Sequence, residues 1–154
     1  MASYVERVLQ PGEQVRRIAH LHWIIYLPGI VTIVIAAILF VLIDSFVREK
    51  TFWQIVPVAL AGIGILQFLW SWLVQWMTEI AVTNRRVIYK FGFIFRNTKE
   101  MQMDKVESVE VDQSIFGRIL NYGNVSVLGT GQGQFTRIKT IAAPLDLRNQ
   151  ITGV

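Results

Sequence analysis

The sequence predicts an α+β membrane protein. An N-terminal transmembrane helical hairpin precedes a small antiparallel β-sandwich or barrel closed by a short C-terminal helix. Two uncharged apolar runs predict the hairpin: residues 24–43, which number twenty, and residues 52–77, which number twenty-six. Because an α-helix rises about 1.5 Å per residue, about 20 residues cross a hydrocarbon core of about 30 Å. From residue 78 onward, apolar residues recur at every second position, which is typical of strands with one buried face.

The chain divides into three parts. We expect residues 1–22 to form a cytoplasmic arm, residues 23–77 the hairpin with spans at about 24–43 and 53–76, and residues 78–154 the β domain. Within the arm, Pro11-Gly12 is a turn signal. Residues 13–22 then read either as a strand, which would add an edge to the β domain, or as the start of the first helix. The first apolar run is preceded by charges and is longer than a signal-peptide core, so we expect it to remain in the mature protein.

The middle of the second span contains small residues and one amide. Ala59, Gly62 and Gly64 would let two helices approach closely, and the side chain of Gln67 can bond to a neighbouring helix. Two interpretations remain open. These residues either pack the second span against the first or form a seam between copies of the chain in a homo-oligomer.

Lysine and arginine residues are unevenly distributed around the two spans. Two lie in the link between the spans, whereas seven lie in the N-terminal arm or soon after the second span. The two are Arg48 and Lys50, and the seven are Arg7, Arg16, Arg17, Arg85, Arg86, Lys90 and Arg96. Because cytoplasmic loops carry an excess of positive charge, we expect both termini to be cytoplasmic. Nothing signals an organelle, so the expected location is a bacterial inner (plasma) membrane.

Residues 78–154 contain several short runs that alternate between apolar and polar side chains, and we count about six strands. The apolar positions include Ile80, Val82, Val87, Tyr89, Phe91, Phe93, Phe95, Met101, Met103, Val109, Val111, Val125 and Val127. A short bend is expected at residues 115–120. Residues 129–133 lack the Lys-Ser/Thr of a phosphate-binding loop and lie between two strands, which favours a hairpin turn. Residues 144–151 predict a final helix, since Pro144 suits a first turn.

The composition argues against several classes of function. The chain has no cysteine, which excludes disulfides and thiolate metal sites. His20 and His22, beside Trp23, suit the membrane interface better than a metal site. The net charge of +4 is interleaved with acids, so we expect no nucleic-acid partner. The β domain has no histidine and its acids alternate on exposed strand positions, so we expect no catalytic residues, no metal and no cofactor.

A set of short motifs in a fixed order resembles a known family. They are Thr83-Asn84-Arg85-Arg86-Val87-Ile88-Tyr89, Lys105-Val106-Glu107-Ser108-Val109, Gln113-Ser114, Gly117-Arg118, Tyr122-Gly123 and Gly129-Thr130-Gly131, with Leu9-Gln10-Pro11-Gly12-Glu13 and His22-Trp23 near the N-terminus. The set resembles the bacterial pleckstrin-homology-like (PH-like) membrane proteins, in which two transmembrane helices precede one small PH-like domain. The resemblance spans nearly the whole chain. It implies seven strands in two antiparallel sheets, closed by a C-terminal helix.

The resemblance implies a fold more firmly than a function, because the family has no established common reaction. We expect a membrane-anchored interaction or scaffold module that binds protein partners or copies of itself, and not an enzyme. The alternative is a sensor of anionic lipid headgroups. Its candidate lipid contacts are Arg16, Arg17, Arg85, Arg86 and Lys90. Arg85 and Arg86 fit equally well as topology signals that cap a hairpin, and we expect Arg118 to bond backbone carbonyls or nearby acids.

Overall fold

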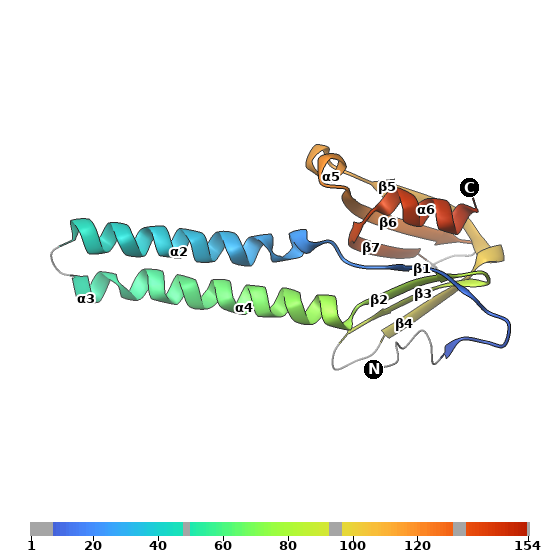
Figure 1. The fold of residues 1–154 in the computed structure, drawn as a ribbon, viewed down its shortest axis with the longest axis horizontal. Coiled ribbons are helices and arrows are strands. Elements are labelled where there is room, and N and C mark those ends of the chain that lie inside the picture. The colour runs from blue at the N-terminus through green and yellow to red at the C-terminus, as the bar shows by residue number, and fades with distance from the viewer. Residues whose placement is uncertain (1–7, 48–49, 93–96, 131–134, 154) are drawn as a thin grey trace. The chain divides into compact units, whose positions relative to one another are not determined.

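The computed structural model describes residues 8–47, 50–92, 97–130 and 135–153 (Figure 1). The chain forms two compact units. One unit comprises Trp23–Leu73, and the other combines Met1–His22 with Val74–Val154. We call them the helical unit and the β unit and describe each by itself.

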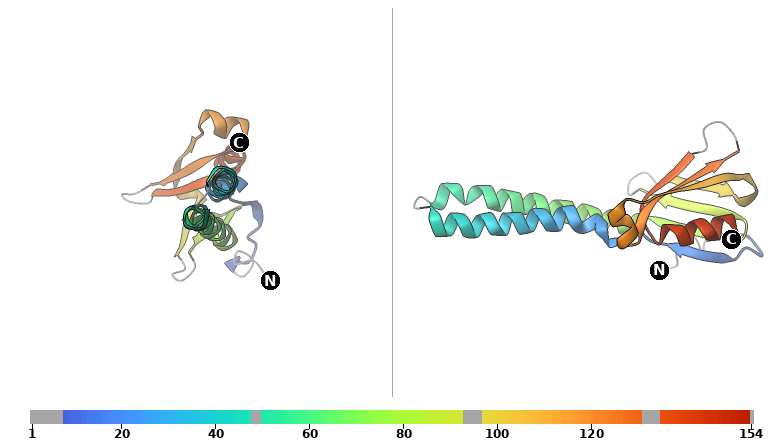
Figure 2. Two further views of the ribbon diagram at one scale, coloured as in Figure 1. Left: turned by 90° about the vertical axis from the view of Figure 1, so that its left-hand side faces the viewer. Right: turned by 90° about the horizontal axis from the view of Figure 1, so that it is seen from above.

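The helical unit consists mainly of two long apolar helices. A 3-10 turn, η1 (Trp23–Tyr26), leads into α2 (Leu27–Phe46), and a short helix, α3 (Lys50–Trp53), precedes α4 (Ile55–Met77). Figure 2 shows α2 and α4 lying side by side. Both are long and apolar enough to cross a membrane, and only 11% of each most apolar window is buried within the chain. The expected pair of helices is therefore present, and few of the residues in its apolar windows are buried.

Two glycines lie where the long helices pack closely against each other. A Cβ atom on Gly64 would lie 2.7 Å from Cγ1 of Ile33, and one on Gly29 would lie 2.9 Å from the backbone nitrogen of Phe68. Since side chains other than hydrogen do not fit there, both positions require glycine in this packing. Gly64 thus packs α4 against α2 within one chain.

Polar contacts reinforce this helix pair. The Thr32 hydroxyl donates to the Pro28 carbonyl oxygen at 2.8 Å and lies 3.0 Å from Oε1 of Gln67. The Ser71 hydroxyl donates to the Ile25 carbonyl oxygen at 2.8 Å. Gln67 therefore contacts the first long helix, as one of the two interpretations expected.

The other two small residues of the predicted packing set lie on an open face of α4. Ala59 is exposed, and a Cβ atom on Gly62 would meet nothing within 4 Å among the described residues. Ala59 and Gly62 therefore do not contribute to the α2–α4 contact, and their role in a seam between copies stays a prediction.

Seven strands of the β unit form two antiparallel sheets among the described residues (Figure 1). The first sheet has the order β1 (Val15–Ala19), β2 (Glu79–Thr83), β3 (Arg86–Phe91) and β4 (Asn97–Gln102). The second has the order β5 (Val106–Asp112), β6 (Tyr122–Gly129) and β7 (Phe135–Ala142). Six strands follow α4, and a seventh precedes α2. The number of strands and sheets agrees with the fold that the resemblance implied.

The sheets do not close into a barrel, which the sequence had left open as an alternative to a sandwich. Between β4 and β5 the chain turns through η2 (Met103–Lys105) instead of continuing as one strand shared by both sheets. At the other side, an isolated bridge between Leu21 and Ile141 is the backbone pairing that links the N-terminal arm to the second sheet among the described residues. The β unit is thus a pair of open sheets.

The N-terminal arm contributes an edge strand rather than a helical turn. In β1, Val15 pairs with Thr83 and Ala19 pairs with Ile80, so β1 runs antiparallel to β2. Strand β1 carries alternating half-buried and exposed residues until Ala19, which belongs to the core. This pattern suits an edge strand with one solvated face.

The core of the β unit lies where the two sheets and the C-terminal helix meet. Helix α6 (Pro144–Thr152) begins at the expected proline and contacts β1, β2, β5 and β6. Fully or nearly fully buried apolar side chains come from both sheets and from α6. They include Ile80, Val82, Val125, Val127, Ile138, Ile141, Leu147 and Ile151. Burial of one face explains the period of two in the sequence.

Two sequence-based expectations fall partly outside the described residues. Phe93 and Phe95, predicted to begin a third strand, lie outside them, and β4 is described from Asn97. The same holds for Gly131 and Gly133 of the predicted hairpin turn. The flanking strands β6 and β7 pair antiparallel up to Leu128 and Phe135, as a hairpin requires.

Candidate functional site

A groove with a mixed polar and apolar lining lies beside the turn that joins β2 to β3. It has a volume of about 690 Å³ and is open to solvent on one side. Its lining combines both signs of charge: Asn84, Arg85, Arg86, Glu100, Gln102 and Lys105 contribute, among others. These residues come from the β2–β3 turn, the end of β4 and η2. A mixed polar lining of this kind can take a partner that offers both donors and acceptors.

A buried ion pair underlies the groove. One guanidinium nitrogen of Arg86 lies 2.9 Å from Oε2 of Glu13, and Nε of Arg86 donates to Oε1 of Glu13 at 3.0 Å. The Glu13 side chain is 0% exposed and that of Arg86 is 12% exposed. This two-point geometry is the strongest arrangement for arginine and carboxylate. It joins the N-terminal arm to β3 across 73 positions of the chain.

Further hydrogen bonds satisfy both members of the pair. The Thr83 hydroxyl donates to Oε1 of Glu13 at 2.7 Å, and the backbone N–H of Gln10 donates to Oε2 at 2.9 Å. Arg86 also donates to the Val8 carbonyl oxygen at 2.8 Å and pairs with Glu100 at 2.7 Å. A buried ion pair is tolerated only when such additional bonds replace the lost water. Arg86 is thus the centre of a network that fixes one wall of the groove.

The network changes the protonation of its members. Burial by itself raises the pKa of Glu13, but hydrogen bonds from Arg86, Gln10 and Thr83, together with the charge of Arg86, outweigh it. The net result is a pKa lowered from 4.5 to about 2. The hydrogen bond to Glu13 raises the pKa of Arg86 above its usual value, and Glu100 adds to that effect. Both groups are therefore charged at neutral pH.

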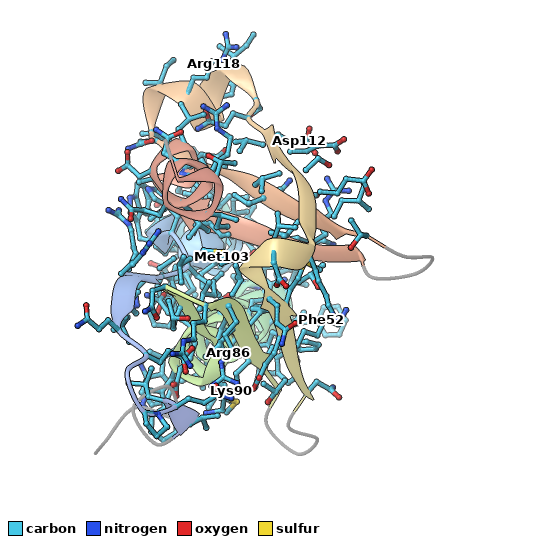
Figure 3. The ribbon with its side chains drawn as sticks, turned by 90° about the vertical axis from the view of Figure 1, so that its right-hand side faces the viewer. Phe52, Arg86, Lys90, Met103, Asp112 and Arg118 are labelled. Carbon is cyan, nitrogen blue, oxygen red and sulfur yellow. The ribbon has the colours of Figure 1, made fainter. Side chains whose placement is uncertain are left out.

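The five cations proposed as lipid contacts do not gather at one place. Arg85 is exposed at the groove, whereas Arg86 beside it is held by Glu13 and Glu100. Lys90 lies at the other end of β3, where it pairs with Glu79 at 3.0 Å. The remaining two belong to β1: Arg16 is exposed, and Arg17 pairs with Asp146 of α6 at 3.5 Å. Figure 3 labels Arg86 and Lys90 among the side chains of the β unit. Lipid binding by these five residues stays a prediction.

A second notable feature is the short helix α5 (Ile115–Ile119), where the sequence suggested only a bend. Ile115, Phe116 and Ile119 are 78%, 71% and 74% exposed. We expected Arg118 to bond backbone carbonyls or nearby acids. Its side chain makes no hydrogen bond or ion pair with any residue that the structure describes. Figure 3 shows Arg118 at the outer edge of the β unit, far from Lys90. Sequence patterns missed this surface because residues 115–120 were interpreted as a bend between strands, and a bend does not indicate whether its apolar side chains are covered.

The motif residues around α5 hold it in one conformation. The Ser114 hydroxyl oxygen caps the helix by accepting from the Gly117 backbone N–H at 3.0 Å. The Gln113 side chain donates to the carbonyl oxygens of Gly117 and Tyr122 at 3.3 and 3.1 Å. A Cβ atom on Gly117 would lie 2.7 Å from the Tyr122 carbonyl oxygen, so this contact requires glycine. The ordered motifs thus build the turn that carries α5.

No group of three or more histidine, aspartate or glutamate residues that could hold a metal ion occurs within the described ranges.

Comparison with known proteins gives one match. A sequence model described as "Bacterial PH domain" matches residues 22–152, which includes both long helices and all strands except β1. No curated protein and no solved structure matches significantly. The match covers most of the chain, and two antiparallel sheets with a C-terminal helix agree with it. The chain therefore belongs to the bacterial PH domain family.

Proposed function

We propose that this protein is a membrane-anchored interaction module whose β unit binds a protein partner at the cytoplasmic face of a bacterial inner membrane. The two long helices are the anchor, and the groove beside the β2–β3 turn is the binding surface. Membership of the bacterial PH domain family supports an interaction module for a protein or a lipid.

We infer the membrane anchor from the exposed apolar side chains of α2 and α4. In the core helix of a soluble protein most residues are buried. Here only 11% of the most apolar window of each helix is buried. Large apolar side chains such as Val41, Leu66 and Trp70 are 61%, 68% and 70% exposed. Contact with water along such a length is strongly unfavourable, whereas contact with lipid chains is not.

The distribution of charge supports the proposed orientation. Arg16, Arg17, Arg85 and Arg86 all belong to the β unit, whereas the link between α2 and α4 contains only two basic residues, Arg48 and Lys50. An excess of positive charge marks the cytoplasmic side of a membrane protein. The β unit is accordingly proposed to lie in the cytoplasm.

The groove supports binding of a protein rather than of a simple anion. Arg85 and Lys105 are exposed along it, but Glu100 and Asp104 lie in the same lining. Acidic side chains oppose a phosphate group, whereas a peptide surface offers both donors and acceptors to such a mixed lining. The wall formed by the Glu13–Arg86 network is pre-organised, which reduces the entropy lost on binding.

Photo-cross-linking in living cells tests this proposal. A photo-reactive amino acid replaces Gln102, which lines the groove, and in a matched variant it replaces Gln150, an exposed residue of α6. We expect a discrete protein adduct from position 102 that position 150 does not give. A lipid adduct from position 102 would instead favour the sensor of anionic headgroups. Equal adducts at both positions, or none at either, would reject the groove as a binding surface.

A further inference from the structure

Within the β unit, α5 has the most exposed large apolar side chains of the described residues. Ile115, Phe116 and Ile119 each expose more than 70% of their surface, whereas Ile18 and Leu145 of the same unit expose 49% and 45%. The cap and the glycine contact described above hold α5 in place. The exposed apolar surface of α5 is therefore part of the fold. Exposed apolar clusters of this kind normally bind another surface.

The contacts of Tyr122 show where α5 lies within the β unit. Tyr122 follows α5 by three positions, and its ring stacks on the ring of His22 with centroids 5.3 Å apart. His22 is the last residue of the N-terminal segment of the β unit and is covalently joined to Trp23, where the first apolar helical segment begins. The neighbouring bridge between Leu21 and Ile141 fixes the same end. Tyr122, which follows α5, is thus held against the residue that directly precedes the first apolar helical segment.

The charge around the cluster suits an anionic surface. Helix α5 contains no acidic residue, and Arg118 stands among its apolar side chains with its long stem exposed. The nearest acid that precedes α5 in the chain, Asp112, lies 3.4 Å from a guanidinium nitrogen of Arg137. An arginine beside apolar side chains can place its stem in the apolar layer and its charge among lipid phosphates.

We propose that α5 inserts Ile115, Phe116 and Ile119 into the interfacial layer of the bilayer that α2 and α4 span, with Arg118 at the level of the phosphates. This inference rests on the proposed membrane anchor. Five residues present far less than the roughly 800 Å² per partner that a stable protein interface buries. Insertion of a few large side chains beside a tether, in contrast, needs only a small area, because the anchor already keeps the segment at the membrane.

Depth-dependent fluorescence quenching tests the proposal on the full chain in nanodiscs that contain phosphatidylglycerol. Because the chain has no native cysteine, single cysteines label specifically. An environment-sensitive dye is placed at Phe116→Cys, at Ile38→Cys in α2, and at Gln102→Cys, an exposed control in the groove. We expect brominated lipids to quench the dye at positions 38 and 116 at least about twofold more than at position 102, with a blue-shifted emission at 116.

The outcomes separate this inference from the proposed anchor. Quenching at position 38 with a solvent-like dye at position 116 would overturn the insertion of α5 and leave the anchor intact. A solvent-like dye at both positions would overturn the anchor itself. Disulfide formation between Phe116→Cys chains at high protein-to-lipid ratio, without quenching, would assign the cluster to a second copy and reject the lipid contact. Arg118→Glu in the labelled Phe116→Cys background should reduce quenching in anionic discs and leave it unchanged in phosphatidylcholine discs.

Discussion

At the scale of single residues, the Glu13–Arg86 pair is the feature with the clearest energetic consequence. Glu13 is fully buried at its side chain, and every oxygen of its carboxylate accepts hydrogen bonds from Arg86, Gln10 or Thr83. Loss of one partner from such a network leaves the other buried and incompletely paired, which costs more than the net contribution of the bond itself.

The first prediction concerns Glu13→Gln. The substitution keeps the size of the side chain but removes its charge, while Arg86 retains Glu100 as a partner. We expect the β unit to lose about 2–3 kcal/mol of stability. Hydrogen exchange of β2 and β3 peptides in detergent-solubilised protein measures this loss. Asp146→Asn, which removes the charge of the exposed partner of Arg17, is the control. It should change the free energy of opening measured by exchange by less than about 1 kcal/mol. Equal effects of both substitutions would contradict the importance of the buried pair.

The second prediction concerns acid. The pKa of Glu13 is about 2 in the folded chain, compared with 4.5 for an unperturbed glutamate, as in the unfolded chain. The folded state therefore binds fewer protons between these values, so the stability supplied by Glu13 is present above about pH 4.5 and is lost as the pH falls toward about 2. Chemical unfolding followed by circular dichroism should show the difference between the natural chain and Glu13→Gln shrinking across this range. A difference that stays constant down to the lower pH would contradict the lowered pKa.

At the scale of elements, the approach of α2 and α4 at glycine decides how the helix pair packs. Gly29 and Gly64 are buried, and a Cβ atom at either would meet backbone atoms of the opposite helix at about 3 Å. The other buried residues lie seven positions away: Ala36 follows Gly29 in α2, and Pro57 precedes Gly64 in α4. An antiparallel pair with a repeat of seven explains this spacing.

The third prediction compares Gly64→Leu with Gly62→Leu. A leucine at position 64 must push the helices apart because it meets Ile33, whereas position 62 is open. We expect Gly64→Leu to destabilise the helix pair by about 1–3 kcal/mol in thermal unfolding in detergent, with little effect from Gly62→Leu. The particle mass in mild detergent is the second readout. A change in mass for Gly62→Leu alone would place a seam between copies on this face, and a strict monomer in the natural chain would reject such a seam.

The fourth prediction concerns the turn that carries α5. Gly117→Ala puts a methyl group 2.7 Å from the Tyr122 carbonyl oxygen. We expect the backbone to shift and exchange of the α5 amides to rise at least about tenfold, corresponding to about 1.4 kcal/mol. The control is Thr130→Ala, at an exposed residue. Gly153→Ala is unsuitable as a control, because the positive φ of Gly153 would strain an alanine. Unchanged α5 exchange in Gly117→Ala would contradict the rigid turn.

At the scale of the whole molecule, periodicity in the sequence predicts much of the architecture. Long uncharged runs identify α2 and α4, and the change to a period of two identifies β2, β3 and β5–β7, because burial on one side imposes these periods. The number of strands and the proline at the start of α6 were also predictable. The ordered motifs led to the right family, which residues 22–152 match.

The contacts of the candidate site were not predictable in the same way. The partner of Arg86 depends on the register of β1 against β2, which brings Glu13 to Arg86 from 73 positions away, and no local pattern encodes such a register. The exposure of α5 was also not predictable, because the apolar residues at 115, 116 and 119 do not by themselves indicate whether a sheet covers them. Lys90, expected as a lipid contact, faces Glu79 on the adjacent strand, a pairing that again follows from register.

The most direct test of the account is the placement of two single cysteines relative to the membrane. Ser45→Cys lies at the end of α2 and Gln102→Cys in the groove, and both positions are exposed in a chain without native cysteine. In spheroplasts of a bacterial host, a membrane-impermeant maleimide should label position 45 at once and position 102 only after the membrane is broken. Immediate labelling at both positions, or release of the unlabelled chain from membranes by alkaline extraction, would contradict a helical hairpin that anchors a cytoplasmic β unit.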